Sequence, residues 1–216
     1  MPYVKKPTLS EKFTLSILVR GSAKKMEISC FLSMTIKGTF ERLSGLATIS
    51  RHETAFAITP DVIRIKSQEA QLNPRKREIL ALHRGDTDAL QRMLNAVQPG
   101  SYVRPHRHLC PPKAELLIIL SGAMAFMSFL DDGSPDTQTF VHLHPTRGSL
   151  AVDCREGVWH TFFALEPDTV VCEVKAGPYD PAAAKEFAPW APAEDSPEAA
   201  SYLASLEQIF RACVTG

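Results

Sequence analysis

Residues 100–122 read GSYVRPHRHLCPPKAELLIILSG, in which an extended, polar stretch leads into a continuous apolar run. His106 and His108 stand two positions apart, so on a β-strand both side chains project to the same face. Glu115 begins the apolar run, which is typical of a buried strand closed by a Ser-Gly turn, and its carboxylate can reach the same side. Two strands carrying two imidazoles and a carboxylate predict a metal site, because these donors together suit divalent Fe, Mn, Zn, Ni or Cu.

Short strand-like runs continue after this segment. The sequence Asp131-Asp132-Gly133-Ser134-Pro135 is a strong turn signal between two of them. Turns separate the runs at regular intervals, and the runs lie at residues 123–130, 139–143, 150–154, 161–165 and 169–175. This regular spacing predicts an all-β sandwich or barrel.

Two helices are expected beside the strands. The first begins at Thr59-Pro60-Asp61, with proline in an early helical position, and is broken by Asn73-Pro74. The second begins near the C-terminus at Ser196-Pro197, with Ser196 as its N-cap. Apolar residues then recur at three- and four-residue spacings, which gives one face for packing on the outside of the barrel: Tyr202, Leu203, Leu206, Ile209 and Phe210.

The composition narrows the class of protein. The chain has 216 residues, 44% of them apolar and 22% charged, enough for one folded domain with an additional segment. Lysine plus arginine equals aspartate plus glutamate at 24 each, so no basic surface for nucleic acid is expected. No run approaches the ~20 apolar residues of a membrane helix. The five scattered cysteines are typical of free thiols, so we expect a cytoplasmic protein. From the charge and the short apolar runs we expect neither a nucleic-acid nor a membrane partner.

A fourth metal ligand is expected downstream. His160 follows Gly157-Val158-Trp159 and is the natural candidate. A His-x-His pair alone is more often exposed or hydrogen-bonded than metal-binding. The chain offers a comparison in His142-Leu143-His144, which has no glutamate at a useful spacing and which we interpret as a structural or surface pair. The neighbouring Glu115 and His160 distinguish the first pair from the second.

The spacing of these residues resembles the two sequence motifs of the cupin superfamily. Five residues match the first motif: Gly100, His106, His108, Glu115 and Gly122. The gap between its second histidine and its glutamate holds six residues, which is longer than usual. Gly157 and His160 match the second motif, whereas Arg155 and Ala164 stand where the family has proline and asparagine. The resemblance implies a mainly β, antiparallel cupin-type barrel (jelly roll) with a few flanking helices, including a C-terminal helix.

Several segments are more closely similar to the WbuC-type cupin fold metalloproteins of bacteria. They are residues 102–108, 111–115, 131–133, 157–161, 173–181 and 187–192. The resemblance covers roughly residues 60–210. It implies one divalent metal ion held by three histidines and a glutamate, and members of this family occur beside genes for surface polysaccharide synthesis. We therefore divide the chain into an N-terminal extension of unknown role without a stable fold of its own, residues 1–55, and a WbuC-like metal-binding domain, residues 56–216.

Two basic side chains are candidates for binding a substrate. Arg104 shares the strand face of the histidines, and an arginine at the barrel mouth can clamp a carboxylate or phosphate. Lys113 lies in the lengthened loop before Glu115 and can bind an anionic ligand. The alternative for each is a solvated surface residue, which is the more common state of arginine and lysine.

Three functions fit this site. In the first, the protein is an enzyme that acts on a small, sugar-derived molecule in surface polysaccharide metabolism, because three histidines and one glutamate leave coordination positions open. In the second, it is a non-catalytic, metal-dependent binding module for a small ligand. In the third, the metal is structural and the barrel serves as the scaffold of a homodimer. We favour the first two, since structural sites are usually closed and sulfur-rich.

Overall fold

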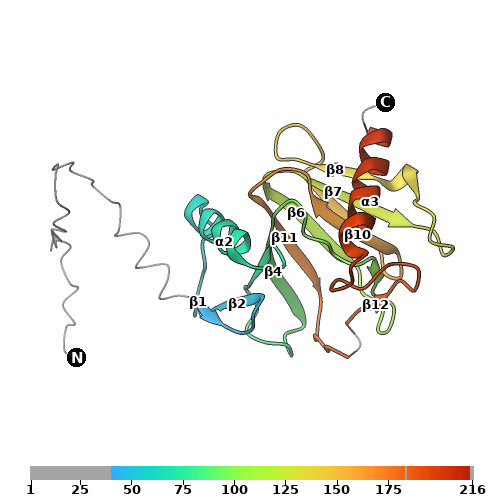
Figure 1. The fold of residues 1–216 in the computed structure, drawn as a ribbon. Helices are drawn as coiled ribbons and strands as arrows, with labels where there is room; N and C mark the ends of the chain where they lie inside the picture. The colour runs from blue at the N-terminus through green and yellow to red at the C-terminus, as the bar shows by residue number, and fades with distance from the viewer. Residues whose placement is uncertain (1–39, 183, 215–216) are drawn as a thin grey trace, which may run out of the picture.

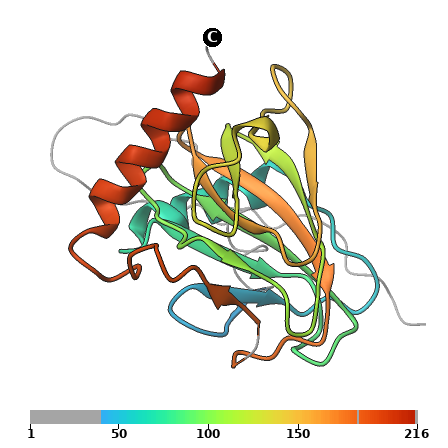
Figure 2. The same cartoon turned by 90° about the vertical axis from the view of Figure 1, so that its right-hand side faces the viewer.

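The computed structural model describes residues 40–182 and 184–214, which form two facing β-sheets with a helix on each outer side (Figures 1 and 2). The larger sheet has seven strands in the spatial order β1 Phe40–Arg42, β2 Ala47–Ser50, β3 Arg77–Ala81, β4 Leu90–Val97, β11 Thr169–Ala176, β6 Glu115–Ser121 and β9 Ala151–Cys154. The smaller sheet has five in the order β12 Glu186–Phe187, β5 His106–Arg107, β10 Trp159–Ala164, β7 Met124–Phe129 and β8 Val141–Leu143. This architecture confirms the predicted mainly β fold with flanking helices, with the described strands paired as two sheets rather than as one closed barrel.

Strand alternation places an apolar core between the two sheets. Leu117 and Ile119 point inward from β6, and Phe126 and Phe162 point inward from the smaller sheet. Together with Val171 of β11 they belong to one buried cluster. Burying a side chain of this size is worth about 1.5–3 kcal/mol relative to exposing it, so the cluster holds the sheets face to face.

Helix α2, Pro60–Leu72, covers the outer face of the larger sheet (Figure 1). It begins as predicted, because Thr59 is the N-cap and its hydroxyl accepts a hydrogen bond from Val62 N at 3.4 Å. It also ends as predicted, at Asn73. Val62 packs with Leu80 of β3 in a buried cluster, which fixes the helix on the sheet.

Helix α3, Ala199–Val214, covers the outer face of the smaller sheet (Figure 2). Its predicted apolar face is confirmed, since Leu203, Leu206 and Phe210 are buried in one cluster with side chains of β7 and β10. The predicted N-cap is wrong: the helix begins at Ala199, and the buried Ser196 hydroxyl has no hydrogen-bond partner among the described residues. Instead, Ala199 N donates a hydrogen bond of 3.2 Å to Ser196 O, which closes a turn before the helix. Neither this helix nor any other in the described ranges combines the length and hydropathy that spanning a bilayer requires.

Residues 40–50, which the sequence analysis placed in the N-terminal extension, belong to the larger sheet. β1 and β2 form an antiparallel hairpin, and β2 pairs in parallel with β3. Ile49 of β2 is buried, and Thr48 Oγ1 accepts a hydrogen bond from the buried Lys66 Nζ at 2.7 Å. The predicted boundary at residue 55 thus falls after a pair of strands that pairs with a distant part of the chain, a relationship that local patterning does not reveal. Residues 1–39 of the predicted extension lie outside the described residues.

Candidate metal centre

Three histidines converge between the sheets. β5 and β10 are antiparallel neighbours, and His106 stands directly opposite His160 in their register. His108 lies two positions after His106 and faces the same way. The ring centroids are 4.5 Å apart for His106 and His160, 5.1 Å for His106 and His108, and 5.7 Å for His108 and His160. One nitrogen of each ring lies within 4.8 Å of the others, and all three residues are buried, so the group could hold a metal ion.

Glu115 reaches this group from the larger sheet, where it is the first residue of β6. Its Oε1 lies 3.0 Å from His160 Nε2, and its Oε2 lies 3.2 Å from His108 Nε2. The residue is only 3% exposed, so water does little to solvate the carboxylate. The structure therefore brings together all four residues that the sequence analysis selected as ligands, from both sheets.

Backbone carbonyls determine which ring nitrogen of each histidine faces the centre. His106 Nδ1 lies 3.0 Å from Arg104 O, His108 Nδ1 lies 2.5 Å from Ala184 O, and His160 Nδ1 lies 2.9 Å from Val158 O. A carbonyl oxygen only accepts, so each Nδ1 must carry the hydrogen. The neutral form of each ring then has its lone pair on Nε2, which is the arrangement that metal-ligating histidines adopt.

Three buried polar atoms at the centre lack hydrogen-bond partners among the described residues. They are His108 Nε2, Glu115 Oε1 and His160 Nε2. Their separations of 3.0–3.2 Å are short, yet the atoms do not have the directional geometry of hydrogen bonds with one another. Buried polar atoms normally have a partner, and leaving one unpaired costs about 1–3 kcal/mol. Donors that point at a common space rather than at each other fit a cation that they would share.

The charges at the centre are strongly coupled. Burial alone would lower the pKa of His160, but the charge of Glu115 and contacts with Cys154 and Glu115 raise it to about 10. Burial alone would raise the pKa of Glu115, but the charge of His160 and contacts from His108 and His160 bring it well below its usual range. Burial lowers the pKa of His106 well below its usual value, and nearby positive charge lowers it further. Without a metal, the centre thus holds a proton on His160 beside an ionised Glu115.

The chain matches one family over part of its length. The family described as "Domain of unknown function (DUF6016)" matches residues 58–144. This range contains α2, β3 to β8 and three of the four residues at the centre, but not His160. No curated protein matches the sequence at a significant level.

Solved structures are similar to about half of the chain. KdgF from Halomonas sp. matches with a TM-score of 0.37 and 19% identity, over 48% of this chain and 81% of that chain. CapF, a capsular polysaccharide assembling protein from Staphylococcus aureus, matches with a TM-score of 0.39 and 22% identity, over 47% of this chain and 27% of that chain. The L-ribose isomerase of Cellulomonas parahominis matches with a TM-score of 0.41 and 16% identity, over 53% of this chain and 70% of that chain. The present chain therefore spans about a quarter of CapF and most of the other two.

The interior beside the centre carries further charged groups on β11. Lys175 stands opposite Glu115 in the register of β11 and β6, with its Nζ 4.0 Å from Glu115 Oε2. The same Nζ lies 2.5 Å from Glu173 Oε1, and Asn95 of β4 donates a hydrogen bond of 2.5 Å to Glu173 Oε2. Neither Lys175 nor Asn95 was predicted as a site residue. For Lys175 the available signal was its place two residues after Glu173 in a strand that is otherwise mostly apolar.

Both predicted substrate-binding residues contact the segment that leads into and out of β12. Arg104 donates a hydrogen bond of 2.8 Å to Ala188 O, and its guanidinium lies over the Phe187 ring at 5.3 Å. Lys113 is buried, and its Nζ donates to Pro178 O. A ligand would have to compete with these hydrogen bonds, so their substrate-binding role remains a prediction.

The comparison pair His142 and His144 lies on and just after β8. The ring of His144 accepts hydrogen bonds of 3.0 Å from the backbone N–H groups of Thr146 and Arg147. The side chain of Arg147 also lies against this ring, with its Nε 3.0 Å from His144 Nε2. These contacts occupy both ring nitrogens of His144 in holding a turn, in contrast to the histidines of the centre.

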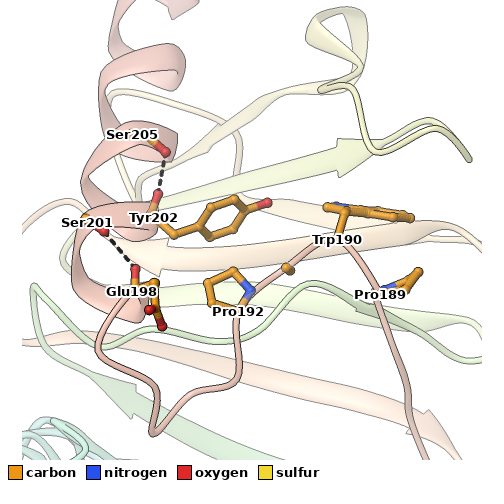
Figure 3. A pocket seen from close by; sticks show the side chains of 8 residues that line it. Pro189, Trp190, Pro192, Glu198, Ser201, Tyr202 and Ser205 are labelled. Carbon is orange, nitrogen blue, oxygen red and sulfur yellow. Dashed lines mark hydrogen bonds between the residues drawn. The ribbon is translucent and has the colours of Figure 1, made fainter.

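A surface hollow lies elsewhere on the molecule, between α3 and residues 189–192. Its volume is about 580 Å³, and Trp190, Tyr202 and Glu198 are among the residues that line it. Figure 3 shows Tyr202 and Trp190 extending along this hollow, with the Ser201 hydroxyl bonded to the Glu198 carbonyl at 2.9 Å. None of the four residues of the metal centre lines it. The chemistry of the centre is therefore separate from this hollow.

Proposed function

We propose that this chain is a WbuC-type cupin metalloprotein that binds one divalent transition metal ion through His106, His108, Glu115 and His160. The observation that carries the proposal is the arrangement of the three rings, in which each Nδ1 is held by a carbonyl and each Nε2 is left for the centre. Three neutral imidazoles and one carboxylate are a donor set for Fe, Mn, Zn, Ni or Cu rather than for Mg or Ca.

We further propose that the metal centre is catalytic and acts on a small, sugar-derived molecule in surface polysaccharide metabolism. A metal bound there would polarise a substrate oxygen. The four donors leave a coordination position for such an oxygen, and the sulfur-free set is unlike that of most structural zinc sites. The chain itself would hold the donors in place, with the larger sheet positioning the carboxylate and the smaller sheet positioning the imidazoles. The expected partner is thus a small molecule. A nucleic-acid partner is not expected, because the chain has a net charge of zero.

Metal analysis of the purified chain tests the first part of the proposal. The double variant His106→Ala/His108→Ala should lose the metal, whereas the matched variant His142→Ala/His144→Ala should retain about one ion per chain. Elemental analysis after dialysis gives the stoichiometry, and circular dichroism shows whether each variant is folded. A folded His106→Ala/His108→Ala protein with undiminished metal would refute the ligand assignment.

Turnover assays test the second part. The metal-loaded chain is incubated with nucleotide-sugars, with and without oxygen, and the products are analysed. Turnover that is lost in the His106→Ala/His108→Ala variant supports an enzyme. Saturable binding without turnover supports the alternative, a non-catalytic module that binds a small ligand through its metal.

A further inference from the structure

Strand β12 brings a lysine to the metal centre from a part of the chain far from the histidines in sequence. In the antiparallel register of β12 and β5, Phe187 stands opposite His106, and Glu186 stands opposite Arg107. Continuing this order by one position beyond the paired residues would set Lys185 against His108. Residues opposite each other in a ladder share a face, and residues two apart on a strand share a face. Lys185 is therefore directed to the same side as His106 and His108, toward the centre.

Neighbouring contacts support this direction. His108 Nδ1 is bonded to Ala184 O, which ties the residue before Lys185 to the centre. The ring of Phe187 lies 6.4 Å from that of His106, so the side-chain face predicted by the ladder is the observed one. The residue of opposite parity, Glu186, points the other way and accepts two hydrogen bonds of 2.8 Å from Arg107. The alternation along β12 thus separates an outer ion pair from an inner lysine.

The amino group of Lys185 has no hydrogen-bond or ion-pair partner among the residues that the structure describes. The two basic groups whose charge acts on it are engaged elsewhere: Lys175 pairs with Glu173, and Arg77 pairs with Glu194. Lys185 as a whole residue is exposed, so part of its side chain is in contact with solvent. Burial and the positive charge of Lys175 nevertheless lower the pKa of the Lys185 amino group to about 8.

The charged groups around the centre leave an excess of positive charge when a metal is bound. The two carboxylates, Glu115 and Glu173, balance the two amino groups of Lys175 and Lys185, since −2 and +2 sum to zero. A divalent ion held by neutral imidazoles adds +2. Because Glu173 is already paired with Lys175, the unmatched charges are those of the metal and Lys185. Their natural complement is an anion that reaches both.

We propose that Lys185 binds the oxyanion group of a small ligand whose other oxygen reaches the metal, so that the substrate class of this centre is acidic. This inference rests on the proposed function. A carboxylate and a phosphate share the chemistry that a lysine recognises, because the ammonium is a compact charge with three donors and no preferred plane. The exposed ring of Phe187 beside His106 adds apolar surface for the carbon skeleton of such a ligand. The ligand class is thus a small organic acid or phosphate ester with a further oxygen for the metal.

Equilibrium binding to the metal-loaded full chain tests this assignment with three probes of similar ring. D-glucuronate carries a carboxylate, D-glucose 1-phosphate carries a phosphate, and D-glucose carries neither. The variants are Lys185→Met, which removes the charge, and Lys185→Arg, which keeps it. Lys76→Met is the control on a surface loop, where Lys76 Nζ donates a hydrogen bond of 3.4 Å to Pro99 O. Metal content is measured first for every protein. Calorimetry then gives the affinity for each probe.

At least one acidic probe should bind more tightly than glucose. Its affinity should fall about tenfold or more in Lys185→Met, while Lys185→Arg and Lys76→Met stay near the wild-type value. The tighter of the two acidic probes identifies the preferred oxyanion. If metal is retained but no acidic probe exceeds glucose, or if Lys185→Met binds like the wild type, the inference is overturned and the metal centre is not. If the wild-type chain holds no metal, the proposed function itself fails, and the inference fails with it.

Discussion

Glu115 Oε1 lies 3.0 Å from His160 Nε2 although the two residues stand on different sheets. Glu115 opens β6 of the larger sheet, and His160 lies in β10 of the smaller one. The contact thus joins the two sheets at the candidate metal centre. A cation bound there would link the sheets, so metal binding and the stability of the fold should be coupled.

Replacing Glu115 with glutamine should weaken metal binding while leaving the fold in place. The substitution keeps the shape of the side chain but removes the negative charge that faces His108 and His160. We expect the dissociation constant for Zn²⁺ or Co²⁺ to rise about tenfold or more, measured by competition with a chromophoric chelator. Glu156→Gln is the control and should bind like the wild type, because Glu156 is exposed and lies shortly before the start of β10, where His160 stands. Equal affinities in the two variants would remove Glu115 from the set of ligands.

Metal should raise the melting temperature of the chain, and a chelator should reverse the change. A ligand that binds only the folded state stabilises it by about 2.7 kcal/mol when its concentration is about 100 times the dissociation constant. Differential scanning calorimetry with added metal, and then with excess EDTA, measures the effect. The His106→Ala/His108→Ala variant should show no shift. A shift of equal size in that variant would mean that the stabilising ion binds elsewhere.

Metal binding should release about one proton at pH 7. The pKa of His160 is raised to about 10, so its Nε2 carries a proton at pH 7 that the metal must replace. The pKa of Glu115 is well below its usual range and that of His106 is lowered, so these groups are already deprotonated and release none. Because protons compete with the metal below the raised pKa, affinity should weaken about tenfold for each pH unit lowered from 9 to 7. Calorimetry in two buffers of different ionisation enthalpy counts the protons, and binding without proton release would contradict the pairing of His160 with Glu115.

Truncating Leu203 should destabilise the fold through loss of the contact between α3 and the smaller sheet. Leu203 is 4% exposed and lies with Phe210 in the buried cluster between α3 and strands β7 and β10. Leu203→Ala should cost about 2–5 kcal/mol of unfolding free energy, measured by urea denaturation. Leu72→Ala is the matched control, since Leu72 is 86% exposed and its loss should change stability by about 0.5 kcal/mol or less. A loss of about 0.5 kcal/mol or less in Leu203→Ala as well would contradict a stabilising role of this contact.

Much of the fold was predictable because its signals are local. Turns and apolar runs marked the strands from β6 to β11, and Thr59 and Asn73 marked the ends of α2. The start of α3 was missed, since Ser196 followed by proline resembles a cap, whereas the chain first makes a separate turn. The hairpin of β1 and β2 was missed because its strands are short and their stabilising partner, β3, is distant in sequence.

The four residues of the centre could be selected from the chain alone, because His-x-His alternation and motif spacing depend only on neighbours. Pairing between distant strands then determined which other groups meet the centre. It directs Nδ1 of His108 to Ala184 O, places Lys175 opposite Glu115, and sets Phe187 opposite His106. It also engages Arg104 and Lys113 with backbone carbonyls rather than leaving them at an open mouth. The physical reason is register: a strand's own residues specify which faces alternate, but only its partner specifies which side chains meet.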